Sequence, residues 1–322
     1  MKEAGRKGKA GGASGNRSNG GRRVRIRTQY GLKGRRSMRA DWFGLGGAAP
    51  TTLVNARNVA HHAAQWGTKA ARANLATVPD DSHSSLTWDA ARAALVSQPL
   101  AAQQGEIRVG LSVADLRLIV LRGSAADDSF ALDGKSDAEA GAWLDALLRA
   151  AGLAPASDVK LPYQLPDHAV ATGARYDAQA EAGALQELAR WFGIAAEVLG
   201  EVSGRLREVR PGPGPVLCWP HHFDIAMVVQ LEAGHAEAAR SIGVGLSPGD
   251  ESCAQPYWYV SPWPKPDPAT LPPAPGPGHW HIQGYTALVA TGEDILKLQD
   301  RRRDTLAFVM QAIAASRALL GG

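Results

Sequence analysis

The sequence predicts a protein of the α+β class, built from two similar halves that each contain a helix, antiparallel strands and a second helix. The main observation is a repeat at an offset of 135 residues, where IRVGLS at 107–112 matches IGVGLS at 242–247. Under the same offset, residues 88–91 fall on residues 223–226 without a gap. The order of helix, strands and helix also agrees between the halves. We therefore expect an internal duplication with pseudo-twofold symmetry, packed into one unit.

The N-terminal segment differs from the rest of the chain in charge. Residues 1–39 hold 13 Lys/Arg and one acidic residue, whereas the whole chain has a net charge of +4, so the remainder carries −8. Because this segment is rich in Gly, Arg and Ser and has little to bury, we expect residues 1–50 to be a disordered basic tail. Translation could also start at Met38. A basic tail can bind phosphates, but the acidic remainder argues against nucleic-acid binding.

The first repeat is expected at residues 51–152. An alanine-rich helix is predicted from about residue 53 to 78, followed by a polar loop, a segment at 86–96 and strands within 106–123 and 127–134. Ser136 is the expected N-cap of a second helix that ends before Gly152. His61 and His62 fall in the first helix and point about 100° apart, so we expect a solvated or capping pair.

The second repeat is expected at residues 177–322, after an ordered linker at 153–176 that has no helical period. Its first helix is predicted from about residue 177 to 209, where RPGPGP ends it. A C-terminal helix is predicted over about 307–320. We expect a monomer or a homodimer.

The segment CWPHHFDIAMVVQL at 218–231 contains the candidate catalytic residues. Taken as one continuous strand, it places His222 and Asp224 on one face, and His221 among core aromatic residues on the other. A carboxylate beside an imidazole fixes the imidazole tautomer and raises its basicity. His222 and Asp224 are therefore predicted to be catalytic, and His221 to be a hydrogen-bonded core histidine.

An extension at residues 247–289 has no counterpart in the first repeat. Its HWH sequence puts His279 and His281 on one strand face, which is half of a metal site. With His222 they are the predicted ligands of a divalent metal, Zn or Fe. The predicted ligand-binding residues are mostly aromatic and acidic: Tyr257, Trp258, Tyr259, Trp263, Trp280, Asp250, Glu251 and His83.

Two functions follow from this residue set. The first is a small-molecule enzyme, in which WPHHFD lies beside or opposite GHWH and the histidines and carboxylates surround a metal. The second is a non-catalytic protein that binds a sugar, a heterocycle or a peptide on the same aromatic surface. Cys218 as a nucleophile is a third reading, although nothing around it marks a reactive thiol.

Composition limits the remaining classes. The chain is 45% hydrophobic and 20% charged, which is typical of a globular protein, and it has no apolar run long enough to span a membrane. Its two cysteines are too few for a disulfide framework. No secretory signal is evident, so we expect a cytoplasmic protein that binds a small molecule.

The motifs WPHHFDIA, GVGLSPGD, PYWYVSPWP and GHWH, with DDSH and LPDH upstream, resemble those of a family of uncharacterised bacterial proteins. The resemblance covers the chain from about residue 50 to the C-terminus. It implies the same domain boundaries and carries no activity or cofactor.

Overall fold

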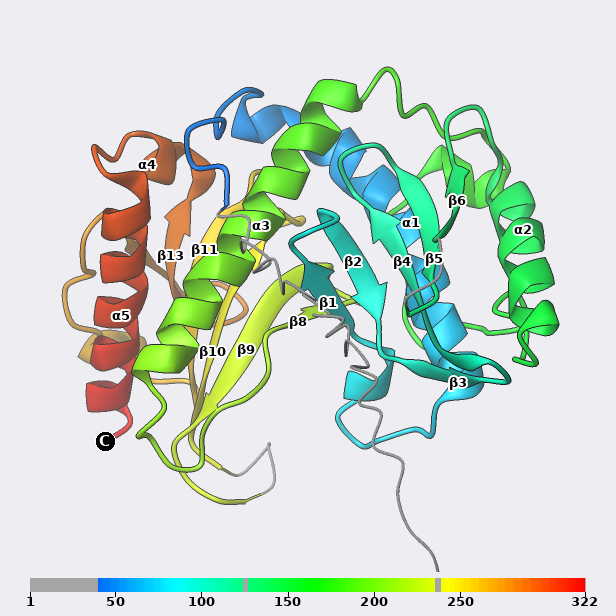
Figure 1. Ribbon diagram of the computed structural model, residues 1–322. Helices are drawn as coiled ribbons and strands as arrows, with labels where there is room; N and C mark the ends of the chain where they lie inside the picture. Colours follow the sequence, from blue (N-terminus) through cyan, green and yellow to red (C-terminus); the bar gives the residue numbers. More distant parts are fainter. Residues whose placement is uncertain (1–39, 124–126, 235–238, 322) are drawn as a thin grey trace, which may run out of the picture. The chain divides into compact units, whose positions relative to one another are not determined.

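The computed structural model describes residues 40–123, 127–234 and 239–321. Within these ranges the chain forms an antiparallel sheet of 13 strands with helices packed against it (Figure 1), which confirms the predicted mixed α+β class. The helices are α1 (Val54–Asn74), α2 (Asp137–Ala150), α3 (Ala182–Arg205), α4 (Gly292–Leu296) and α5 (Arg301–Leu319), with short 3-10 helices at Pro50–Thr52, Ser82–Ser84, Ala169–Thr172 and Pro268–Thr270.

The strands of both halves belong to the same sheet. They are β1 (Leu86–Asp89), β2 (Ala94–Ser97), β3 (Leu100–Ala102), β4 (Gly105–Ser112), β5 (Arg117–Leu121), β6 (Asp128–Ala131), β7 (Gly212–Pro213), β8 (Leu217–Trp219), β9 (Asp224–Gln230), β10 (Ser241–Ser247), β11 (Tyr257–Trp263), β12 (His279–His281) and β13 (Ala287–Thr291). Their order is β12-β13-β11-β10-β9-β8-β1-β2-β4-β5-β6, with β3 paired to β4 and β7 to β9. The halves join where Leu86 of β1 pairs with Cys218 of β8.

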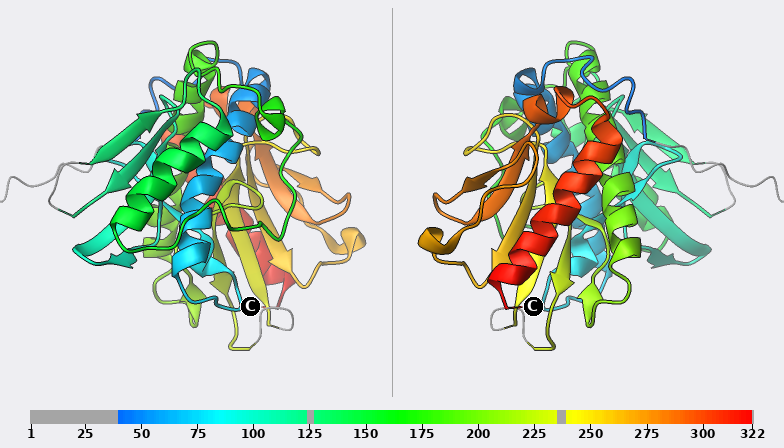
Figure 2. Two further views of the ribbon diagram at one scale, coloured as in Figure 1. Left: turned by 90° about the vertical axis from the view of Figure 1, so that its right-hand side faces the viewer. Right: turned by 90° about the vertical axis from the view of Figure 1, so that its left-hand side faces the viewer.

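One face of the sheet packs against the long helices. Leu95 and Leu111 from the first half, and Ile225 and Leu246 from the second, belong to a single buried cluster with the inner faces of α1 and α3. In Figure 1, α3 and α5 lie in front of β9–β11, whereas α1 lies behind β4 and β5, and the side views of Figure 2 agree. The sheet twist accounts for this, because the same face turns from front to back along the strand order.

The opposite face of the sheet, which we call the open face, carries the alternate residues of each strand. In the first half it holds a small apolar cluster of Ala94, Val96 and Ile119. In the second half it holds Tyr257, Ala287 and Val289, with further partly buried residues around them. The two halves therefore differ most on this face.

Local sequence explains the helix positions. Ala60, Ala63 and Ala64 let α1 lie close to the sheet, and a Cβ at Gly67 would come within 3.1 Å of the Val109 carbonyl oxygen. For α2, the predicted cap is confirmed, since the Ser136 side chain accepts from the Glu139 amide in a capping box. The helices α1 and α3 are shorter than predicted at their ends.

The predicted pair His61 and His62 is buried, so the expectation of a solvated or capping pair is wrong. The His62 Nε2 atom lies 2.8 Å from the Pro166 carbonyl oxygen, because the segment 153–176 crosses α1. Tyr163 of the same segment donates to Gln65 Oε1 at 2.8 Å. The predicted linker is thus held against α1 by hydrogen bonds.

The folded chain begins before residue 50. The buried carboxylate of Glu187 in α3 accepts from the amides of Gly46 and Gly47, and Glu197 accepts from the amide of Ala40. Asp41 forms an ion pair with Arg190 at 3.0 Å. The predicted tail boundary at residue 50 is therefore too late, and the rest of that predicted tail, residues 1–39, lies outside the described residues.

The segment 218–231 is not a single strand. It forms β8, a four-residue turn at 220–223 and β9, so that Trp219 pairs with Asp224. Phe223 closes the turn with a left-handed φ of 59°. His222 therefore lies in the turn, and the strand alternation that placed it on the same face as Asp224 is wrong.

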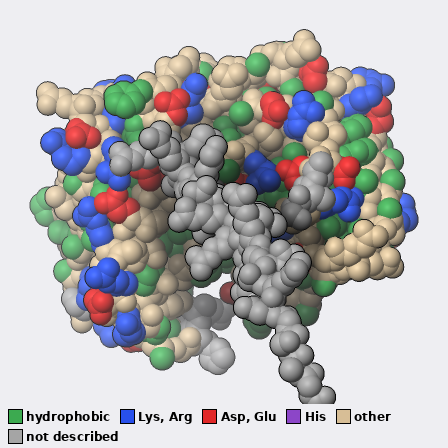
Figure 3. Space-filling model, in the orientation of Figure 1, with side chains coloured by type: hydrophobic (Ala, Val, Ile, Leu, Met, Phe, Trp, Pro, Cys, Tyr) green, Lys and Arg blue, Asp and Glu red, His purple; other side chains and the backbone are tan. Residues whose placement is uncertain are grey.

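Charged side chains are largely paired with one another on the surface. Figure 3 shows basic and acidic side chains intermingled on the face that carries α3 and α5. Arg302 of α5, for example, bridges Glu197 and Glu201 of α3 at 2.7 and 2.6 Å. None of the helices in the described ranges meets the length and apolarity that a membrane crossing requires.

Candidate functional site

Asp224 and Tyr259 form the centre of a polar cluster on the open face. Asp224 begins β9 and is 7% exposed, and Tyr259 of β11 donates its hydroxyl hydrogen to Asp224 Oδ2. The other carboxylate oxygen, Oδ1, is buried and has no hydrogen-bond partner among the described residues. A buried carboxylate oxygen without a donor is costly, which makes it a candidate contact for a ligand.

Gly245 makes this contact sterically possible. It lies on β10 between Ala226 of β9 and Tyr259 of β11. A Cβ at Gly245 would lie 2.6 Å from the Tyr259 hydroxyl oxygen and 2.7 Å from the Ala226 Cβ. The Tyr259 side chain therefore extends across a strand that has no side chain at this position, and reaches the carboxylate on the next strand.

The environment favours the neutral forms of both groups. Burial raises the pKa of Asp224, although the hydrogen bond from Tyr259 and the charge of nearby His222 act in the opposite direction. Burial, and then the adjacent Asp224 charge, raise the pKa of Tyr259 well above its ordinary value. Asp224 is thus a carboxyl group that can hold or accept a proton closer to neutrality than an exposed aspartate.

Asp250 lies in the same cluster with an opposite environment. Its Oδ1 accepts from the amides of Ser252 and Cys253 at 2.8 and 3.0 Å, and Oδ2 accepts from the Tyr257 hydroxyl. Burial acts to raise the pKa of Asp250, but these hydrogen bonds outweigh it and the pKa is lowered. The cluster therefore contains one carboxylate that is fully bonded and one that is not.

Three tyrosines connect the two carboxylates. The rings of Tyr257 and Tyr259 lie 6.3 Å apart, and the Tyr285 hydroxyl donates to that of Tyr257 at 3.3 Å. We call Asp224, Asp250, Tyr257, Tyr259 and Tyr285 the Asp–Tyr cluster. Its rim includes His281, whose ring lies 4.5 Å from that of Tyr285.

The turn at 220–223 brings His222 to this cluster, and contacts with α1 hold the turn in place. His61 Nε2 lies 2.7 Å from the Pro220 carbonyl oxygen, and the His61 ring stacks on Phe223 at 4.8 Å. Burial lowers the pKa of His61 to about 4, so it stays neutral and structural. His221 and His222 are exposed on the turn with their rings 4.2 Å apart, and His221 is therefore not the core histidine that the sequence predicted.

The predicted metal ligands are not brought together. His279 and His281 lie on β12, and β13, β11 and β10 separate that strand from β9. Four strand spacings correspond to about 19 Å, so the expectation that WPHHFD lies beside GHWH is wrong. Across the described ranges, no three or more His, Cys, Asp or Glu side chains are grouped so as to hold a metal ion. A shared site for His222, His279 and His281 thus has no support in this fold.

Several predicted ligand-binding residues have other positions. Trp258 is fully buried beneath the helices, and the Trp280 indole donates to the Pro272 carbonyl oxygen at 2.7 Å. Neither position fits a ligand platform on the open face. Trp263 is 45% exposed at the end of β11, and Glu251 is exposed in the loop after Gly249. His83 is buried next to β1 and lines a separate pocket with Thr87 and Leu217.

The predicted ligand-binding residues did not include Tyr285 or Arg57. Arg57 of α1 is buried, and its guanidinium lies 3.4 Å from the Ala254 carbonyl oxygen and within the field of Asp250. It therefore supports the loop that carries Asp250. Tyr285 could have been found from the aromatic alternation of its segment, but Arg57 could not, because it is distant in sequence.

No protein-family model, curated protein or solved structure matches the chain. The resemblance to a bacterial family remains a prediction.

Proposed function

We propose that the Asp–Tyr cluster binds a small polar molecule and that Asp224 is its central contact. The observation that carries this proposal is the buried Asp224 Oδ1, which has no described hydrogen-bond partner. This oxygen is closed off from solvent, so a hydroxyl, amine or amide N–H of a ligand would satisfy it only after a side chain of the cluster moves aside. A carboxylate or phosphate group would be repelled by the Asp250 carboxylate, whose pKa is lowered, and would bring no N–H or O–H donor to Asp224 Oδ1, so the ligand class is neutral or cationic.

The same geometry suits proton transfer. A carboxyl group with a raised pKa can act as a general acid or base, and His222 on the exposed turn is close enough to influence its charge. We propose that Asp224 and His222 exchange a proton with the bound molecule, which would make the protein an enzyme. The second candidate function is non-catalytic binding, which the tyrosine-rich surface around Asp224 favours equally.

A binding screen tests the proposal. Ligand-observed NMR on the full chain, with a library of small alcohols, amines and amides, should give compounds whose affinity falls about tenfold or more in Asp224→Asn and in Tyr259→Phe. The matched control is Asp89→Asn, an aspartate of the first half that accepts from the Ala91 amide at 2.9 Å. The proposal fails if no compound distinguishes Asp224→Asn from Asp89→Asn. If one of the bound compounds is also converted, and His222→Asn abolishes the conversion while binding persists, the protein is an enzyme.

We also propose that the halves arose by duplication. Gly110 pairs with Val96 and Ile119, and Gly245 pairs with Ala226 and Tyr259, which supports the predicted match of IRVGLS to IGVGLS. The hairpins β1–β2 and β8–β9 correspond instead at an offset of 130, since Ala94 and Asp224 hold the same first position of the second strand. The ungapped match of residues 88–91 to 223–226 is therefore not retained.

Both cysteines are free thiols, Cys218 being buried. Burial raises the pKa of Cys218 well above its ordinary value, which argues against a nucleophilic role. Free thiols agree with a reducing compartment, and we propose a cytoplasmic small-molecule protein.

A further inference from the structure

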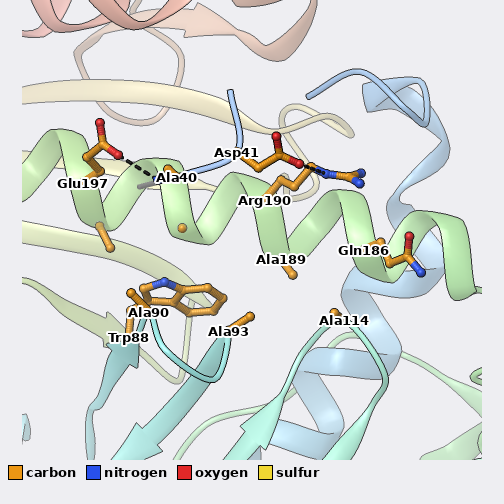
Figure 4. A pocket seen from close by; sticks show the side chains of 12 residues that line it. Ala40, Asp41, Trp88, Ala90, Ala93, Ala114, Gln186, Ala189, Arg190 and Glu197 are labelled. Atoms are coloured by element: carbon orange, nitrogen blue, oxygen red, sulfur yellow. Dashed lines mark hydrogen bonds and ion pairs between the residues drawn. The ribbon is translucent and has the colours of Figure 1, made fainter. Parts of the chain in front are cut away.

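A second candidate site lies on the other side of the sheet, against α3. A pocket of about 670 Å³ opens between α3 and the turns that follow β1 and β4 (Figure 4). The Trp88 indole lies in it, and the residues around the indole are small: Ala90, Ala93, Ala114, Ala189 and Gly193. We call it the α3 groove. Its volume falls within the usual range for small-molecule sites.

The second half shows what fills the corresponding position there. The turns 90–93 and 220–223 have the same length and close the same kind of hairpin, and their last residues, Ala93 and Phe223, both have a left-handed φ, of 48° and 59°. The Phe223 ring is fully buried between its turn and α1, stacked on His61 and 5.1 Å from Phe192. Ala93 supplies no ring, and an open groove lies beside it.

The surroundings of the groove favour an aromatic occupant. The ring centroids of Trp88 and Phe192 lie 6.0 Å apart in a stacked arrangement, so Phe192 holds the Trp88 ring in place on one side. Gly193 has no side chain that could cover the indole. A Cβ at this position would lie 3.6 Å from Trp88 Cζ2, which is ordinary van der Waals contact. A flat ring can therefore lie on Trp88 in an offset stack.

The charges at the rim favour an uncharged occupant. Arg190 is paired with Asp41 at 3.0 Å and with Glu187 at 3.1 Å, and Glu197 is paired with Arg302 at 2.7 Å. An anionic ligand would have to compete with these carboxylates for the arginines, and a cationic ligand would have to compete with the arginines for the carboxylates.

We propose that the α3 groove binds an uncharged aromatic molecule, whose ring lies on Trp88 and takes the place in the first half that the Phe223 ring has in the second. This site is independent of the Asp–Tyr cluster.

Indole is the probe that tests the proposal, by saturation-transfer NMR and calorimetry on the full chain. We expect saturable binding to the wild type, weaker binding of the anion indole-3-carboxylate, and at least about a tenfold loss of indole affinity in Ala93→Phe. Phenylalanine tolerates this backbone conformation, as Phe223 shows. The matched control is Ala91→Phe, which puts the same side chain on an exposed position of the same turn and should leave indole affinity unchanged.

Gly193→Ala is the second variant, in case Ala93→Phe does not fold. It should raise the thermal midpoint, because alanine is the better helix former, and weaken indole binding by covering Trp88. Absence of saturable binding to the wild type, or equal affinity in the wild type, Ala93→Phe and Gly193→Ala, would overturn the proposal. Binding of a phenylalanine-containing peptide in place of indole would also overturn it.

Discussion

The two halves of the sheet place different chemistry at the same strand positions of the open face. Around Gly110 the neighbours are apolar: Ala94, Val96, Ile119 and Leu121. Around Gly245 the corresponding positions hold Asp224, Ala226, Tyr259 and Ser261. The strand pairing around the two glycines is the same. The difference between an apolar face and a polar cluster therefore depends on a few side chains.

On the helix face the relationship is reversed, because the turn of the second half has an apolar ring that the turn of the first half lacks. Phe223 closes its turn with a buried ring, whereas Ala93 leaves the α3 groove beside Trp88. Each half therefore has apolar side chains at one of these two positions and lacks them at the other. Both candidate sites thus lie where one half lacks an apolar side chain that the other half has.

The largest expected effect is that of Gly245→Ala. The new Cβ would displace Tyr259 and leave two buried polar groups without partners, so we expect the free energy of unfolding to fall by about 3 kcal/mol. Urea denaturation measures it. The control is Gly243→Ala on the same strand and face, where a Cβ meets its nearest atoms at 3.9 Å and should cost much less. Equal losses in the two variants would contradict the role of Gly245.

A smaller loss is expected for Tyr259→Phe. Removing the hydroxyl deprives the buried Asp224 of its described donor, so the free energy of unfolding should fall by about 2 kcal/mol. Adding Asp224→Ala should recover most of the loss, because both positions are then apolar, as Ala94 and Ile119 are in the first half. A double-mutant cycle measures the coupling, and an additive result would show that the two side chains do not interact.

The smallest expected effect is a difference in pH dependence between the two aspartates. Because the folded pKa of Asp224 is raised, its contribution to stability is full below the unfolded value of about 3.9 and is lost as pH rises through the folded pKa. The folded pKa of Asp250 is lowered, so its contribution is present above about 3.9 and is lost as pH falls through the folded pKa.

Unfolding of the asparagine variants between about pH 3 and about pH 7 tests this. Relative to the wild type, Asp224→Asn should gain stability as pH rises and Asp250→Asn should lose it. If the stability of both variants relative to the wild type changed with pH in the same direction, one of the two pKa shifts would have been assigned incorrectly.

Part of the candidate site could be predicted from the sequence. Asp224, Asp250, Tyr257 and Tyr259 were expected at a site, and the structure brings these four residues together. The metal prediction depended on His222 and β12 being neighbours. Sequence patterns cannot give that relationship, because strand order is decided by long-range pairing.

The class of elements and their capping could be predicted from the sequence, as Ser136 and Glu139 illustrate, because these depend on residues within one or two turns of each other. The sequence also indicated the glycines of IRVGLS and IGVGLS. What those glycines accommodate depends on the fold, in which Val96 lies over one and Tyr259 over the other. The physical reason is that a strand residue contacts side chains on neighbouring strands, whose identity the local sequence does not contain.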